Sequence, residues 1–131
     1  MLLIALLLEV APATQSPCWN AGSDLEISQC WDRADQAADA ELNKIWPDVL
    51  KSAREADRDF MPTQRRETPA AVQDLISAQR AWLKYRDAQC ALESDYAQGG
   101  SLEPILSAKC STEMTRARIM QLHDIAAGFR E

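Results

Sequence analysis

The stretch Gln79–Cys90, QRAWLKYRDAQC, holds the residue types best suited to chemistry in this chain of 131 residues. At steps of three, four and four, Gln79, Trp82, Arg86 and Cys90 share one face of a helix. A face that only filled a core would be apolar, whereas this one sets a guanidinium beside an indole and an amide. A buried arginine is costly unless it is paired and hydrogen-bonded. The stretch therefore predicts a helix whose Arg86 needs acidic and polar partners elsewhere in the chain.

Signals for catalysis or metal binding are weak. His123 is the single histidine and no GxSxG sequence occurs, so nothing is placed to activate a serine. The cysteines form no CxxC pair and none lies near His123, which argues against zinc. The carboxylate pairs Asp57/Asp59 and Glu93/Asp95 fall on charged helical faces, which are usually solvated. We expect no catalytic residue, no metal site, no cofactor and no enzyme activity.

Composition predicts one compact domain without a nucleic-acid or membrane partner. The chain is 47% hydrophobic and 26% charged with only 4 Gly, which suits a helical core and excludes disorder. The net charge of −6 opposes binding to phosphate backbones or anionic lipid. An acidic protein is drawn to cationic partners, although the same charge also serves solubility.

The first 13 residues, MLLIALLLEVAPA, are typical of a secretion signal. Leu2–Leu8 is apolar but shorter than the roughly 20 residues that span a bilayer, and Ala11 and Ala13 are the small residues that a signal peptidase reads. No Lys or Arg precedes the run, so an upstream start and a buried N-terminal helix stay open as alternatives. Cleavage after Ala13 leaves 14–131 as one periplasmic or secreted domain without stable membrane insertion, with 19 acidic and 14 basic residues.

Apolar residues at helical spacing predict a first helix from about Ser23 to Phe60. Pro47 interrupts it. A proline inside a helix removes a hydrogen bond and clashes one turn back, at a cost of about 3 kcal/mol. We therefore expect a kink near Pro47, or two helices that meet there.

Two further helices follow, joined by short connections. Thr68-Pro69 is a start signal for a helix that runs to about Gln98, and the turn at Gly99–Gly100 precedes a third helix that ends near Gly128. The apolar residues expected in the core of the second helix are Val72, Leu75, Ile76, Trp82 and Leu83. Short connections place consecutive helices antiparallel, so the predicted fold is an all-α three-helix bundle.

Four cysteines in a small exported chain favour two disulfides. Cys90 and Cys110 lie ten residues before and after the Gly100 turn, at one height of an antiparallel hairpin. Cys18 and Cys30 then remain, and the irregular N-terminus can fold back to join them. Three connectivities are possible, and this pairing is the one we favour.

The spacing of these residues resembles the LprI-type lysozyme-inhibitor domain family of small exported bacterial proteins. The resemblance is carried by Cys30, by Asp39-x-x-Leu42-Asn43-x-x-Trp46, by Gln79-x-x-Trp82-x-x-x-Arg86-Asp87-x-x-Cys90, and by Gly99-Gly100-Ser101, Cys110 and Thr115-x-x-Arg118. It implies a helical, disulfide-bearing domain of the cell envelope and inhibition of lysozyme. The motif residues also suit a fold-defining polar network, whose members are Asp39, Asn43, Gln79, Trp82, Arg86, Asp87, Thr115 and Arg118.

If the motif builds the core, a partner must bind elsewhere. The candidates are two loop tips, the Met61–Glu67 connector and the turn Tyr96–Glu103, in which Tyr96, Ser101 and Glu103 are the expected contacts. The first hypothesis is a protein-binding inhibitor that occludes a cationic lysozyme. The alternative is a helical adaptor of the envelope without inhibitory activity.

Overall fold

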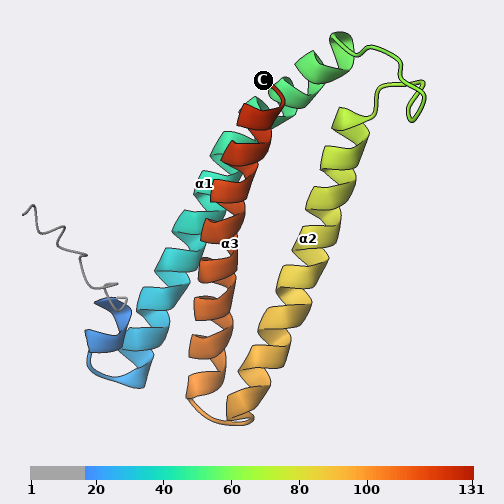
Figure 1. The fold of residues 1–131 in the computed structure, drawn as a ribbon. Helices are drawn as coiled ribbons and strands as arrows, with labels where there is room; N and C mark the ends of the chain where they lie inside the picture. Colours follow the sequence, from blue (N-terminus) through green and yellow to red (C-terminus); the bar gives the residue numbers. More distant parts are fainter. Residues whose placement is uncertain (1–16) are drawn as a thin grey trace, which may run out of the picture.

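The computed structural model describes residues 17–131 and consists of three long helices (Figure 1). The order is η1 (Pro17–Asn20), α1 (Asp24–Arg58), α2 (Ala71–Ser94), η2 (Asp95–Ala97) and α3 (Leu102–Gly128), where η marks a 3-10 helix. The described residues form no strand, and the predicted all-α three-helix fold is confirmed. The predicted signal segment, 1–13, lies outside the described residues.

The helices run up, down and up, so α1 and α3 are parallel and α2 is antiparallel to both (Figure 1). α3 packs along α1 and also carries α2, whereas α1 and α2 contact each other least. The side of the bundle between α1 and α2 is therefore its least closed side.

A capping box fixes the start of α1. The Ser23 hydroxyl accepts a hydrogen bond from the Glu26 backbone N–H at 3.3 Å, and the Glu26 carboxylate accepts from the Ser23 backbone N–H at 2.9 Å. The Ser23 backbone and hydroxyl donors hold the pKa of Glu26 below its usual value. A depressed pKa means that this contribution to stability is present above pH 4.5 and is lost as the pH falls through the folded-state pKa.

Pro47 lies inside α1 and does not end it. The predicted break into two helices is wrong, and a kink there is not shown. Leu42 and Val49, on either side of Pro47, are both buried in one apolar cluster, so packing holds the two flanks in a single helix. Pro47 has no N–H to donate to the carbonyl of Asn43, one turn earlier. Asn43 is exposed, so water can donate to this carbonyl instead.

The N-terminus of α2 is capped from another helix. Thr68-Pro69 does not cap it: the helix begins at Ala71, and its N-cap residue Ala70 has no side-chain hydrogen bond. Instead the two Asp57 carboxylate oxygens accept from the backbone N–H groups of Ala71 and Val72, at 2.7 and 3.1 Å. A carboxylate here satisfies two free donors and faces the positive end of the helix dipole.

The core consists of two apolar clusters with a polar layer between them. The cluster near the α1–α2 connector contains Leu42, Val49, Ala53, Leu75, Ile119, Leu122 and Ala126. The cluster near the α2–α3 turn contains Cys18, Ile27, Trp31, Ile105 and Ala108. Between them α3 contributes Thr112 and Thr115, both fully buried. Trp82 packs on the first cluster as predicted, but Leu83 is 36% exposed, so its assignment to the core is wrong.

Both predicted disulfides are confirmed. Cys18 bonds Cys30, which ties η1 to α1, and Cys90 bonds Cys110, which ties α2 to α3. Both bonds belong to the half of the bundle that contains the α2–α3 turn. Each closes a loop of 12 or 20 residues, for which the chain-entropy model gives a stabilisation of about 3 kcal/mol.

The cap across helices gives a stability prediction. Asp57→Ala should lower the free energy of unfolding by about 1–2 kcal/mol, because two N–H groups at the start of α2 lose their acceptor. Asp59→Ala is the matched control, since Asp59 contacts only the exposed Arg58 side chain. Urea unfolding of both variants measures the difference, and equal stabilities would contradict the capping role.

Candidate functional site

Arg86 connects all three helices. Its Nη1 donates to Asp39 Oδ1 of α1 at 2.9 Å and to Thr115 Oγ1 of α3 at 3.1 Å. Its Nε donates to Asp87 Oδ1 on its own helix at 3.1 Å, and its guanidinium carbon lies 5.2 Å from the centre of the Trp82 ring. The Arg86 side chain is only 12% exposed, and the predicted pairing with Asp39 is observed, although Asp39 itself is half-exposed.

The charge of Arg86 is compensated despite its burial. Burial opposes the charged form, but the hydrogen bond to Asp87 and the charge of Asp39 outweigh it, so the pKa of Arg86 is raised. The Asp39 side chain is 47% exposed and keeps part of its hydration. The pair therefore avoids the full desolvation cost that a wholly buried ion pair incurs.

Arg118 is buried, and no carboxylate of residues 17–131 pairs with it. Its Nε donates to Gln79 Oε1 at 3.0 Å, its Nη1 donates to Gln121, and its guanidinium lies 5.8 Å from the Trp82 ring centre. Its Nη2 is buried and has no hydrogen-bond partner among the described residues. Burial accordingly lowers the pKa of Arg118. Trp82 thus lies beside two guanidinium groups, only one of which has a counter-charge.

The residues predicted as one network fall into two linked groups. Asp39, Asp87 and Thr115 surround Arg86, while Gln79 pairs with Arg118, and Trp82 contacts both arginines. Asn43 forms no side-chain hydrogen bond within the described chain and instead lines a groove. Arg86 is held by Asp39 and Thr115 and Arg118 by Gln79, so the arrangement suits a structural role better than ligand binding.

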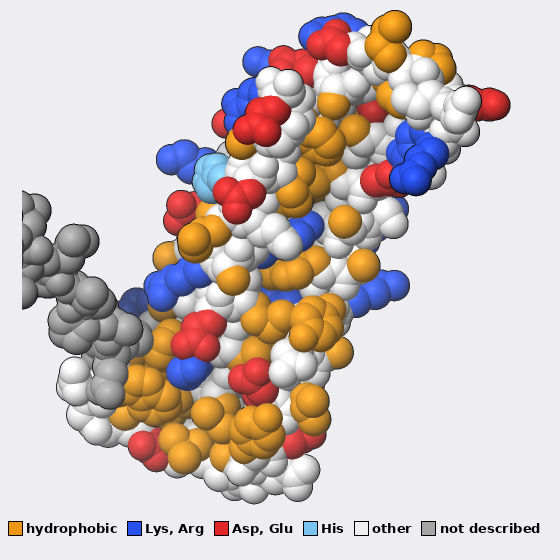
Figure 2. Space-filling view, viewed as in Figure 1, with side chains coloured by type: hydrophobic (Ala, Val, Ile, Leu, Met, Phe, Trp, Pro, Cys, Tyr) orange, Lys and Arg blue, Asp and Glu red, His pale blue; other side chains and the backbone are white. Residues whose placement is uncertain are grey.

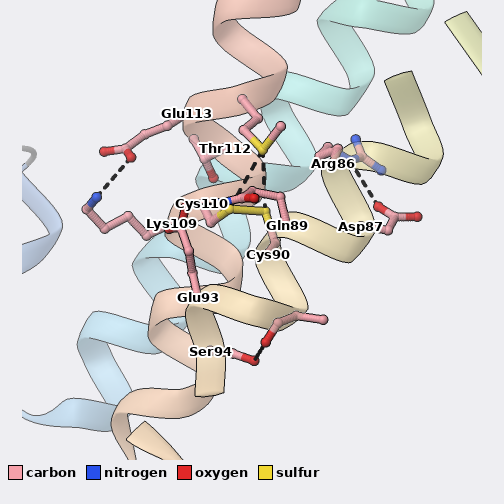
Figure 3. The surroundings of a disulfide bond; sticks show 12 residues. Arg86, Asp87, Gln89, Cys90, Glu93, Ser94, Lys109, Cys110, Thr112 and Glu113 are labelled. Atoms are coloured by element: carbon pink, nitrogen blue, oxygen red, sulfur yellow. Dashed lines mark hydrogen bonds and ion pairs between the residues drawn. A yellow bond between two sulfur atoms is a disulfide. The ribbon is translucent and has the colours of Figure 1, made fainter. Parts of the chain in front are cut away.

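The Cys90–Cys110 disulfide lies just below this layer (Figure 3). Both of its sulfur atoms lie 3.8 Å from the Met114 sulfur, a van der Waals contact because disulfide sulfur carries no hydrogen. Around it, Gln89 donates to Glu93 and Lys109 donates to Glu113, on the exposed sides of α2 and α3 (Figure 3). The disulfide therefore fixes the register of the hairpin directly beneath Arg86.

Grooves follow the open side between α1 and α2. Above the Arg86–Asp39 pair, a groove of about 370 Å³ is lined mainly by the apolar side chains of Trp46, Leu50, Ile76 and Leu83. Below the pair, a groove of about 610 Å³ is lined by carboxylates and hydroxyls, including Asp32, Asp35, Asp87 and Ser107. The Arg86–Asp39 salt bridge joins α2 to α1 and separates the two grooves.

The predicted partner-binding turn is ordered by its own contacts. Glu103 accepts from the Gly99 backbone N–H at 3.0 Å, and the Ser101 hydroxyl donates to Asp24 at the start of α1. Gly99 has φ +72, a left-handed conformation that favours glycine. Tyr96 is 77% exposed and makes no side-chain hydrogen bond in the described structure. Of the three predicted contact residues, only Tyr96 is free of internal bonds.

The other predicted tip, the Met61–Glu67 connector, is exposed and closed by a pair of backbone hydrogen bonds between Thr63 and Arg66. Arg66 also pairs with Asp74 at 3.0 Å. Over residues 17–131, no group of His, Cys, Asp and Glu has the arrangement of a metal site. No helix in this range is long and apolar enough to cross a membrane.

Removal of charge should affect stability much more at Arg86 than at Arg118. Arg86→Met should lower the free energy of unfolding by about 3 kcal/mol, because Asp39 loses its counter-charge and the buried Thr115 loses a donor. Arg86→Lys should also be costly, since one ammonium cannot replace the donors on Nε and Nη1. Arg118→Met is the control and should change stability by less than about 1 kcal/mol, because removal of an unpaired buried charge offsets the donor that Gln79 loses. Urea unfolding of the three variants checks this order, and equal losses for Arg86→Met and Arg118→Met would contradict it.

Comparison with known proteins agrees with this geometry. The profile of the family described as lysozyme inhibitor LprI matches residues 18–122, which span both disulfides and the whole polar layer. An uncharacterised protein of Rhizobium meliloti (strain 1021) is 39% identical over 124 residues, covering 92% of this chain and 88% of the relative. No solved structure gives a significant match. The chain belongs to the LprI lysozyme inhibitor family.

Proposed function

We propose that this protein is an exported inhibitor that binds a lysozyme and blocks its cleft. Membership of the LprI lysozyme inhibitor family is the observation that carries the proposal. The two disulfides fit an oxidising compartment such as the periplasm, and the apolar N-terminal segment fits export to it.

The mechanism is steric occlusion by a rigid protein, not chemistry on a substrate. Arg86 is paired with Asp39 and Thr115, and Arg118 is buried against Gln79, which leaves exposed chain to make the contact. The Tyr96–Glu103 turn supports this role because the Cys90–Cys110 disulfide fixes its base and Glu103 closes it internally. A turn that is ordered before binding loses less conformational entropy when it enters a cleft.

Electrostatic attraction assists the encounter. Lysozymes with excess positive charge are drawn toward an acidic inhibitor, which raises the association rate and sets the orientation of approach. The net charge of −6, or −5 for residues 14–131, supports this part of the mechanism.

The test is a cell-wall lysis assay with purified, oxidised protein and lysozymes of several classes. We expect inhibition of a cationic lysozyme at near-stoichiometric inhibitor. Inhibition should weaken several-fold as salt rises from about 0.1 M to about 1 M, because the Debye length shortens from about 10 Å to about 3 Å. Reduction of the disulfides is the internal control and should abolish inhibition if the turn must be held rigid.

Two outcomes would contradict the proposed inhibition, and a third would contradict only its electrostatic part. Full lysozyme activity at a large excess of oxidised protein would exclude inhibition. Binding to a lysozyme or to other envelope proteins without loss of activity would favour an adaptor role. Inhibition that does not change with salt would remove the electrostatic part alone.

A further inference from the structure

The end of the bundle that carries both disulfides differs in charge from the rest of the molecule. Residues 18–39 and 87–113, here called the disulfide end, hold ten acidic residues against Arg33 and Lys109, a net formal charge of −8. Residues 40–86 and 114–131 hold nine acidic and twelve basic residues, a net charge of +3. The helices place these two sets at opposite ends of the bundle (Figure 1). The molecule is therefore strongly dipolar, which its overall charge does not reveal.

Five of the nine exposed large hydrophobic side chains of the described structure belong to the same end. They are Trp19, Leu25, Leu92, Tyr96 and Leu102, here called the apolar anchors. Leu25 is 67% exposed although it lies in the first turn of α1. Figure 2 shows hydrophobic side chains gathered at the lower end of the bundle, with acidic groups among them. Exposed apolar side chains within a charged surround are typical of protein interaction sites.

Internal contacts hold the elements that carry the anchors. The Ser101–Asp24 hydrogen bond joins the α2–α3 turn to the start of α1, and the residues next in the chain are the anchors Leu102 and Leu25. Trp19 packs edge-on against the buried Trp31, with ring centres 6.3 Å apart. The two disulfides fix η1 on α1 and α2 on α3. An exposed surface built on fixed elements needs little reordering when a partner binds.

We propose that the disulfide end is the docking face for a cationic protein. The apolar anchors supply the buried centre of the contact, and the surrounding carboxylates pair with lysine and arginine side chains of the partner. The inference rests on the proposed function for the partner's identity, a cationic lysozyme. It extends the contact beyond the Tyr96–Glu103 turn to η1 and the first turn of α1.

Charge also decides against the other exposed candidates. The connector of residues 61–67 carries Arg65 and Arg66 against Glu67, and the groove beside α2 that includes Arg80 also presents Lys84. Both surfaces belong to the part of the bundle with a net positive charge, and neither offers the excess of carboxylates that would attract a cationic partner.

The first test compares charge reversal at the two ends. Asp32→Lys/Asp95→Lys alters the disulfide end, and Glu41→Lys/Asp124→Lys is the control with the same change in net charge. All four carboxylates are exposed and form no side-chain hydrogen bond in the described structure. Titration calorimetry against a cationic lysozyme at about 0.1 M salt should show binding weakened about 10-fold or more by the first pair and about 2-fold or less by the control.

The second test removes anchors without changing charge. Leu92→Ser/Tyr96→Ser should weaken binding about 10-fold or more, whereas Tyr85→Ser/Met120→Ser, equally exposed residues from the middle of the bundle, should leave it unchanged. Circular dichroism spectra and thermal unfolding curves, monitored by the same signal, check that each variant keeps the wild-type fold.

Binding and inhibition are measured separately so that the two proposals can fail independently. If wild-type protein binds lysozyme without inhibiting it, the proposed function falls, and the variants still decide the docking face. Equal weakening by both charge-reversed pairs, or wild-type affinity of the anchor variant, would overturn the docking face even if inhibition is observed. Absence of binding by the wild-type protein would overturn both.

Discussion

The interaction on which the rest of this structure depends is the contact of Arg86 with Asp39 and Thr115, because it joins α1, α2 and α3 at one level. The layer divides the core into two apolar clusters, and α1 and α2 have few other contacts with each other. Apolar packing alone tolerates many registers of three parallel and antiparallel helices. A guanidinium that must donate to a carboxylate and a hydroxyl at the same time is compatible with few helix registers. The Cys90–Cys110 disulfide then fixes the hairpin one turn below.

This arrangement separates the residues that specify the fold from those free to bind a partner. Arg86 is paired within the bundle and Arg118 is buried beside Gln79, so both guanidinium groups near Trp82 have structural contacts that need no ligand. The disulfide end carries exposed apolar side chains and an excess of acidic over basic residues. With the docking face proposed above, stability and recognition depend on different residues, and variants of the disulfide end should change affinity without unfolding the chain.

Sequence reasoning succeeded where spacing alone decides a contact. The Cys90–Cys110 disulfide follows from the height of residues across a hairpin, and Cys18–Cys30 is then the remaining pair. The helical spacing of Arg86 predicts a buried cation that needs a carboxylate, and Asp39 is one of the motif residues that could supply it. It failed where tertiary packing overrides a local rule: α1 continues through Pro47 because both flanks are buried. The Asp57 cap of α2 was missed because it acts across 14 residues, with no local signature. The charge difference between the ends was hidden because residues 18–39 and 87–113 are distant in sequence and meet only in the folded bundle.

Hydrogen exchange of the backbone, measured with and without a cationic lysozyme, tests most directly whether the fold-defining layer and the docking face are separate. Lysozyme should slow exchange at residues 18–26 and 92–104, which carry the apolar anchors. Exchange around Asp39, Arg86 and Thr115 should be slow in the free protein and unchanged on binding. Protection instead along the groove beside Trp46 and Leu83, with the disulfide end unaffected, would contradict the separation and assign recognition to the opposite half of the bundle.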